Sequence, residues 1–428
     1  MAVYRRAGTV GRSTWRRNVN GTLISLRKDC ESVNRADARC QAVTDVAAEL
    51  SSALFTSLRR TDQRLKARQY LDGLLHASGR KSMRNIAARV GTPAAEQSMH
   101  HFISDSTWDW TPIRRKLACG LEECCPSTVW VVRSLFIPKT GRHSVGVEQH
   151  VGPGAGQTMS GQSAYGVWMT GASVSAPVNW RLCLPPSWAR DPVRRRRAAI
   201  PADVVEERAE ECATAVALDT ARRWGLTPRP ILLDTELHDL GSVFRRVRSA
   251  NVPLISRVGD TARLEVADPA MPGFGGGRLP AQRILASVRG LRRTAVWADP
   301  AAGGVSRTSL VAAVRVQPPG TVSSPQVAGG PGALLLVGEW SDPGRPPVRM
   351  WLTDMTEAAP EALLALSKFG RRAARDLVDK GNRVGLYDFE GRSFPGWHRH
   401  MTLASVAYAS LRGDCLGARG GPSPAGPV

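Results

Sequence analysis

Val129-Trp130-Val131-Val132-Arg133-Ser134-Leu135-Phe136-Ile137 is an apolar run interrupted only by Arg133 and Ser134, and it predicts a buried β-strand. On its N-terminal side, from about 43 to 117, apolar residues recur at the spacing of buried helix faces. On its C-terminal side, the stretches 143–150, 163–175 and 178–184 have the composition of further strands. The run therefore marks the change from an all-α region to a region that contains a sheet.

The order of the later elements predicts that parallel strands join this sheet. A helix is expected at 203–225, a strand at 230–234, a second helix at about 238–250 and a strand at 252–258. Two strands that follow one another through a helix pair in parallel, with a right-handed crossover. Beyond them, strands are expected at 308–317, 333–340 and 348–353, and helices at about 357–380 and 398–411.

We therefore predict an α/β protein built from several parts. They are a flexible basic arm at 1–40, a helical domain at 41–125, a mixed-sheet core at 126–258 and 348–412, a Gly- and Pro-rich β insertion at 259–347, and a disordered tail at 413–428.

Positive charge dominates the chain. Its 428 residues include 58 Lys and Arg against 37 Asp and Glu, which gives a formal net charge of +21 and a pI of about 10.7. Such a surplus favours a polyanionic partner such as double-stranded DNA, because each neutralised phosphate releases counterions; a merely Arg-rich composition is the alternative. No run reaches the roughly 18 apolar residues of a membrane span, and no secretory signal is visible. We expect a cytoplasmic, nucleoid-associated protein without membrane contact.

The eight cysteines do not predict a metal site. They form no C-x-x-C pair, and no His follows at zinc-finger spacing. We interpret them as buried or incidental thiols; they are Cys30, Cys40, Cys119, Cys124, Cys125, Cys183, Cys212 and Cys415.

The stretch 81–103 predicts a helix-turn-helix-like unit within the helical domain. Gly91 suits a helix end, Thr92 can cap the next helix, and Pro93 suits its first position. The second helix would bury Ala95, Met99, Phe102 and Ile103 and turn Gln97, His100 and His101 outward. The outward face could enter a major groove, with further contacts from Lys81, Arg84 and Arg89. An ordinary helical hairpin packed on a neighbour is the open alternative.

A second basic element is the run Arg194-Arg195-Arg196-Arg197, which follows Pro192 in an expected loop. Four adjacent guanidinium groups suit phosphate contacts. A solvated charge run without a function would have the same sequence.

One tract near the C-terminus carries a family resemblance. Leu386-Tyr387-Asp388-Phe389-Glu390-Gly391-Arg392-Ser393-Phe394-Pro395-Gly396-Trp397-His398-Arg399-His400 resembles the tract after the catalytic glutamate in bacterial insertion-sequence transposases of the DDE superfamily. Shorter matches in the same order span roughly residues 55–410, at Gly79-Arg80-Lys81-Ser82, Ser106-Thr107-Trp108-Asp109-Trp110, Pro138-Lys139, His143-Ser144-Val145-Gly146-Val147, Asn179-Trp180-Arg181-Leu182, Leu184-Pro185 and Trp224-Gly225-Leu226. The resemblance implies a ribonuclease H-like mixed sheet with flanking helices.

The resemblance also implies where catalytic carboxylates belong. Members of the superfamily cut and join DNA with three carboxylates that hold two divalent metals, Mg²⁺ or Mn²⁺. The first lies in a tract like V-V-D-D-T-G-F-P-K, where this chain has Arg133 and Ser134; the third lies at Ala374, counted back from Phe389-Glu390-Gly391. Asp234 alone matches, at the second position. We expect no cofactor, unless an active protein takes Mg²⁺ or Mn²⁺ at Asp234.

Other acids do not easily replace the missing ones. Glu148 on a neighbouring strand could face inward, whereas Asp376 lies about 200° around the helix from Ala374, and Asp379 shares that helix. We expect Arg133 to contact Asp234 and stand in for the metal with an ion pair. As an alternative, Asp234 is a strand-end residue that orients the following loop.

Three functional hypotheses follow. The first is a transposase-descended DNA-binding protein, catalytically impaired, in which Arg133, Ser134 and Ala374 replace carboxylates. The second is an active transposase with displaced ligands, and the third is a non-catalytic scaffold that binds RNA or an acidic protein. Because transposition by this superfamily usually bridges DNA ends with a multimer, the resemblance also implies a homo-oligomer.

Overall fold

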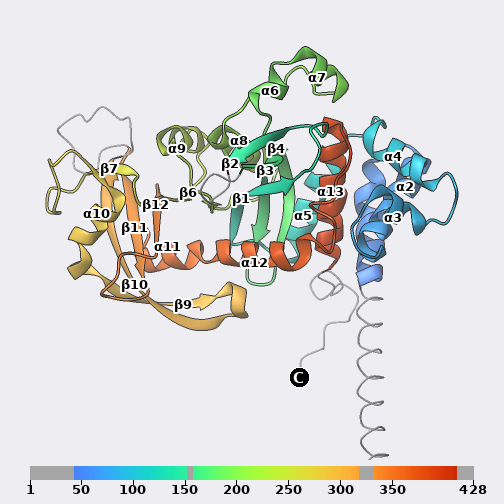
Figure 1. Cartoon of the computed structure of the whole chain (residues 1–428). Helices are drawn as coiled ribbons and strands as arrows, with labels where there is room; N and C mark the ends of the chain where they lie inside the picture. The colour runs from blue at the N-terminus through green and yellow to red at the C-terminus, as the bar shows by residue number, and fades with distance from the viewer. Residues whose placement is uncertain (1–42, 152–157, 318–331, 412–428) are drawn as a thin grey trace, which may run out of the picture.

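The computed structural model describes residues 43–151, 158–317 and 332–411 (Figure 1). The expected arm at 1–40, the expected tail at 413–428 and part of the β insertion lie outside these residues. The described strands form one mixed sheet that runs from the core in the middle of the molecule into the insertion at one end, and the N-terminal helices lie at the opposite end (Figure 1). Within this part of the chain, no helix is long and apolar enough to cross a membrane.

The N-terminal region is helical, as predicted. Its elements are a helical stretch at 43–54, η1 (Phe55–Ser57), α2 (Thr61–His76), α3 (Met83–Ala88), α4 (Ala95–Ser104) and α5 (Thr111–Cys124). The predicted faces of α4 are confirmed: its buried side chains are Ala95, Met99, Phe102 and Ile103, and its exposed ones include Gln97, His100 and His101.

The turn between α3 and α4 differs in detail from the prediction. Gly91 has a φ of +74°, a conformation that suits glycine after a helix. Thr92 does not cap α4, because its carbonyl accepts a bond from the Ala95 N–H (3.0 Å) and closes a turn first. The helix therefore begins later than predicted, with Ala94 as its N-cap and no side-chain cap.

The core sheet has ribonuclease H-like topology, as predicted. Its strands are β1 (Val129–Pro138), β2 (Val147–Val151), β3 (Thr158–Thr170), β4 (Ser175–Leu182), β5 (Ile231–Leu233) and β6 (Leu254–Arg257). The first strands pair antiparallel, β1 with β3 and β3 with β4, whereas β5 joins β1 in parallel and β6 joins β5 in parallel. The spatial order β4-β3-β1-β5-β6 places β1, the predicted buried strand, at the centre.

Helices complete the parallel crossovers. After α6 (Pro186–Ala189) and α7 (Pro192–Arg197), α8 (Ala209–Arg223) precedes β5 and α9 (Leu240–Arg248) lies between β5 and β6. The apolar face of α8 packs on β1, β3 and β4. Asp239 caps α9 through a bond from the Ser242 N–H to its carboxylate (3.0 Å), which fixes the start of that helix.

The insertion extends the core sheet instead of standing apart from it. Its elements are β7 (Arg263–Val266), β8 (Arg278–Pro280), α10 (Ala281–Ser287), η2 (Arg289–Leu291), β9 (Arg293–Asp299), η3 (Pro300–Ala302), β10 (Val305–Gln317) and β11 (Leu334–Trp340). The next strand, β12 (Arg349–Thr353), pairs antiparallel with both β6 and β11. Hydrogen bonding is therefore continuous from the core into the insertion (Figure 1).

The predicted long helix at 357–380 is interrupted. It consists of α11 (Pro360–Ser367) and α12 (Phe369–Gly381), separated at Lys368, whose N–H bonds three residues back to the Ala365 carbonyl (3.2 Å). The Lys368 side chain is buried and pairs with Glu339 of β11. The last helix, α13 (Phe394–Ser410), packs against β4, α2 and α4 and so joins the core to the N-terminal helices (Figure 1).

Candidate functional site

The register of β1 and β5 brings Arg133 beside Asp234. Val132 is the partner of Leu233 in this parallel pair, and the Asp234 N–H continues the ladder to the Val132 carbonyl (3.1 Å). The next residues on the two strands, Arg133 and Asp234, are therefore neighbours.

Arg133 and Asp234 form an ion pair, which confirms the predicted contact. Nη1 of Arg133 donates to Oδ2 of Asp234 and also to the Gly370 carbonyl of α12 (3.2 Å). The side chains are 20% exposed for Arg133 and 6% exposed for Asp234, so the pair is largely shielded from water. Nε of Arg133 is buried and has no hydrogen-bond partner among the described residues.

Gly370 lets α12 approach Asp234 closely. A Cβ at this position would lie 2.9 Å from both Cγ and Oδ2 of Asp234. Ala374 follows Gly370 by four residues and so lies on the same face of α12. The expected third carboxylate position is thus on the helix face that covers the pair, and it carries a methyl group.

Two residues of the quoted motifs, Tyr387 and Lys139, have buried surroundings that the sequence did not reveal. Burial raises the pKa of Tyr387, while the positive charge of Arg133 acts to lower that pKa. Lys139, at the end of β1, donates to the Phe389 carbonyl, and burial lowers its pKa to about 8. A glycine within the helix expected at 357–380 was the sequence signal for Gly370.

The candidate replacement acids lie elsewhere. Glu148 pairs with Gly161, which pairs with Pro138, five residues along β1 from Arg133, so Glu148 faces the opposite side of the sheet. The prediction that it could face inward toward the site is wrong.

Ser134 and the two acids of α12 are also accounted for. Ser134 is exposed on the sheet face opposite Arg133. Asp376 lies between Arg372 (3.9 Å) and Lys380 (3.7 Å), and Asp379 pairs with Arg375 (3.7 Å). In the described part of the chain, no group of three or more His, Cys, Asp or Glu side chains could hold a metal ion.

The donor set at Asp234 does not fit a pair of divalent metals. It offers one carboxylate, and the guanidinium of Arg133 occupies the place beside it. Hard dications require several oxygen ligands, and a cation at bonding distance from the carboxylate opposes their entry.

The predicted DNA-contacting residues of the helical region are mostly exposed. Arg84 and the outward residues of α4 face solvent; His101 also pairs with Asp105 (3.6 Å), and Arg89 with Asp72 (3.3 Å). Lys81 differs from the expectation that it is exposed and contacts DNA. Its side chain is buried and donates to the Ala77 carbonyl. Burial lowers its pKa, so Lys81 serves packing in this conformation.

The run Arg194–Arg197 lies in α7 and not in the expected loop. Arg195 turns inward and donates to the carbonyls of Ala189 (2.9 Å), Pro201 (2.6 Å), Ala202 (3.4 Å) and Val204 (2.8 Å). Arg194 lies over the Trp188 ring (5.3 Å), whereas Arg196 and Arg197 are exposed. Two of the four guanidinium groups are therefore directed toward the protein.

The C-terminal tract joins the helical region to the core. His398, Arg399 and His400 are buried at the start of α13. Arg399 donates to the Trp108 carbonyl (3.1 Å), and His400 bonds to the Tyr70 hydroxyl (2.8 Å). These residues therefore act in packing between α13 and the N-terminal helices.

Comparison with known proteins identifies the family of the chain. The sequence model of a family described as DDE superfamily endonuclease matches residues 53–317, more than half of the chain. The matched range includes Arg133 and Asp234 and ends before α12. No curated protein matches the chain.

Proposed function

The chain belongs to the DDE superfamily endonucleases, and from this premise we propose that it is a DNA-binding protein, descended from an insertion-sequence transposase, that does not cleave DNA. The observation that supports this proposal is the ion pair of Arg133 with Asp234, the residue at which the resemblance implies a metal ligand.

The loss of cleavage follows from charge. A guanidinium stays protonated at any ordinary pH, so Arg133 cannot relieve its repulsion of an incoming dication. An Asp234 that is already paired gains little by exchanging the guanidinium for a metal held by no second carboxylate. Ala374, on the covering face of α12, offers no oxygen to complete the site.

DNA binding is supported by charge and by surface. The net charge of +21 favours duplex DNA. Arg84 and the exposed residues of α4 offer donors for a groove, and Arg196 and Arg197 offer phosphate contacts.

The test of DNA binding is a salt titration of a labelled duplex, with RNA and an acidic polypeptide as competitors. We expect log K to fall linearly with log salt, and duplex DNA to compete best. The double variant Arg196→Ala/Arg197→Ala should reduce the salt slope by about 2, since about one counterion is released per neutralised phosphate.

The matched control in the same helix is Arg195→Ala, which removes bonds to four carbonyls and should lower stability. Stronger competition by RNA would favour an RNA-binding scaffold, and stronger competition by the acidic polypeptide would favour a protein-binding scaffold. An unchanged salt slope in the double variant would show that α7 does not contact DNA.

A further inference from the structure

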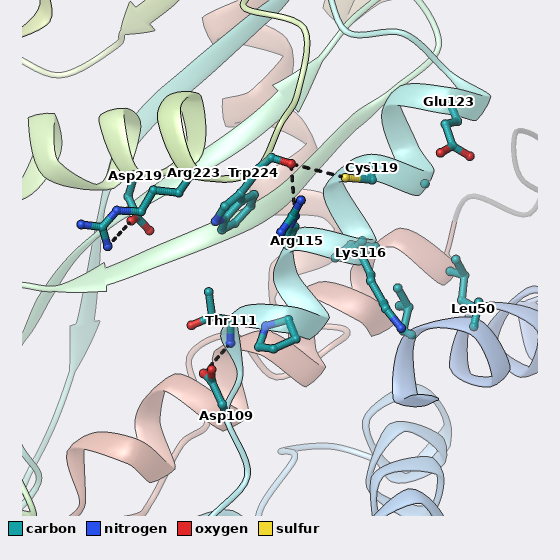
Figure 2. Close-up of a pocket in the computed structure, with 15 residues that line it drawn as sticks. Leu50, Asp109, Thr111, Arg115, Lys116, Cys119, Glu123, Asp219, Arg223 and Trp224 are labelled. Carbon is teal, nitrogen blue, oxygen red and sulfur yellow. Dashed lines mark hydrogen bonds and ion pairs between the residues drawn. The ribbon is translucent and has the colours of Figure 1, made fainter. Parts of the chain in front are cut away.

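A cavity of about 690 Å³ lies where the helical stretch 43–54, α5 and the end of α8 meet (Figure 2). It is distinct from the Arg133–Asp234 pair, because none of its lining residues belongs to β1, β5 or α12. Its volume lies within the range of about 300–1,000 Å³ that is typical of sites for small ligands.

The wall of this cavity is largely apolar. Leu54, Leu117 and Trp224 are buried side chains that line it, and Leu50 and Pro112 are partly buried. Such a wall favours a ligand with an apolar body, because contact with it removes apolar surface from water.

Arg115 supplies a cation in the middle of the lining residues (Figure 2). Its Nε donates to the Trp224 carbonyl (3.2 Å), its one hydrogen bond within the described residues. A guanidinium has five N–H donors in a fixed plane, so the terminal groups of Arg115 remain for a ligand. The side chain is exposed and forms no ion pair with any described carboxylate.

The carboxylates that line the cavity do not neutralise Arg115. Asp219 pairs with Arg223 (3.3 Å), and Asp109 accepts from the Thr111 N–H (2.9 Å). Glu123 lies more than two helical turns beyond Arg115 on α5. Figure 2 shows these three side chains spread around the edge of the site, with Arg115 and Trp224 between them.

We propose that this cavity binds a small amphipathic anion, an apolar body that carries one carboxylate. The carboxylate accepts from the terminal nitrogens of Arg115, a bidentate geometry that guanidinium and carboxylate share. The apolar body packs against Trp224, Leu117 and Leu54. Because the lining residues come from both the N-terminal helices and α8, such a ligand would bridge the helical region and the core, independently of DNA binding.

The test is isothermal titration calorimetry of the full chain with decanoate and, separately, with decanol. We expect saturable binding of decanoate and about tenfold weaker binding of decanol, since decanol lacks the charge that Arg115 recognises. Arg115→Gln should weaken decanoate by about tenfold and leave decanol unchanged. Equal affinity of wild-type protein for the two compounds would overturn the proposal.

Gly120 provides a matched pair of variants. It lines the cavity, and a Cβ at this position would meet nothing within 4 Å. Gly120→Phe should fill the space and abolish decanoate binding, whereas Gly120→Ala should bind as the wild type does. A thermal melt of each variant identifies any loss of folding. If Gly120→Phe does not fold, the affinity of Arg115→Gln for decanoate tests the proposal instead. Full binding by a folded Gly120→Phe, or displacement of decanoate by duplex DNA, would place the ligand elsewhere and overturn the assignment.

Discussion

At the scale of single residues, Arg133 and Asp234 depend on each other. Arg133→Ala leaves the Asp234 carboxylate, 6% exposed, without its cationic partner. Removing one member of a buried ion pair costs about 3–5 kcal/mol, and the partial exposure of Arg133 places the expected loss near the lower limit. Denaturant unfolding at neutral pH measures this change in the free energy of unfolding.

The matched control for that loss is the double variant Arg133→Ala/Asp234→Asn, in which no charge is stranded. It should be more stable than Arg133→Ala alone, because a neutral amide is cheaper to bury than a carboxylate. Equal stability of wild type and Arg133→Ala would show that the pair does not hold the site together.

Gly370 gives a second prediction at this scale. Gly→Ala inside a helix normally stabilises by about 1 kcal/mol. At Gly370 the new methyl group would meet Asp234 at 2.9 Å, so we expect Gly370→Ala to destabilise the protein. Gly120→Ala, in the open part of α5, should instead show the normal gain. Thermal unfolding of both variants is the measurement, and a gain at Gly370 would contradict the close approach of α12.

At the scale of elements, α13 should make stability depend on pH. Burial lowers the pKa of His400 from 6.5 to about 4, and burial also lowers the pKa of His398. Between these values the unfolded chain binds more protons than the folded chain, so the free energy of unfolding falls as pH falls. For His400 alone, we expect a loss of about 2 kcal/mol between about pH 7 and pH 5.

Urea unfolding across this pH range tests the prediction. His100→Gln, on the exposed face of α4, should leave the pH dependence unchanged. His400→Gln should reduce the dependence, even if it also lowers stability throughout. Stability that is constant between neutral pH and pH 5 would mean that the imidazoles of α13 are not held neutral.

The helix α7 and the buried Lys81 show which structural features could be predicted from the sequence and which could not. The α7 helix was predicted as a loop, although Asp191 as N-cap and Pro192 at the first position were visible helix signals. The buried state of Lys81 was not visible, because the Asp388 carboxylate that accepts from its backbone N–H is 307 residues away. Helix caps can be recognised from neighbouring residues, whereas the burial of a side chain depends on residues far away in the sequence.

At the scale of the whole molecule, the arrangement of the core sheet could be predicted, but the pairing of the insertion with the core could not. The apolar runs predicted β1 and β5, and the resemblance added the ribonuclease H-like sheet and hence the contact of Arg133 with Asp234. The resemblance did not reveal that β12 pairs with both β6 and β11, because strand register across an insertion is set by tertiary packing. The close approach of Gly370 to Asp234 could not be predicted either, because it depends on the distance between α12 and β5.

The charge of the molecule and the chemistry around Asp234 point in different directions. The net charge of +21 favours binding to DNA. Under the proposed function, the ion pair at Asp234 and the methyl group of Ala374 oppose the two-metal chemistry of DNA cleavage. Binding without cleavage is the account that reconciles them.

One measurement tests that account most directly: nicking of supercoiled plasmid by the purified chain with Mg²⁺, with Mn²⁺ and with a chelator, at salt concentrations where it binds DNA. The account predicts binding in all conditions and nicking in none. Metal-dependent nicking that disappears in Asp234→Ala would contradict it and would show that Asp234 serves an active metal site despite Arg133.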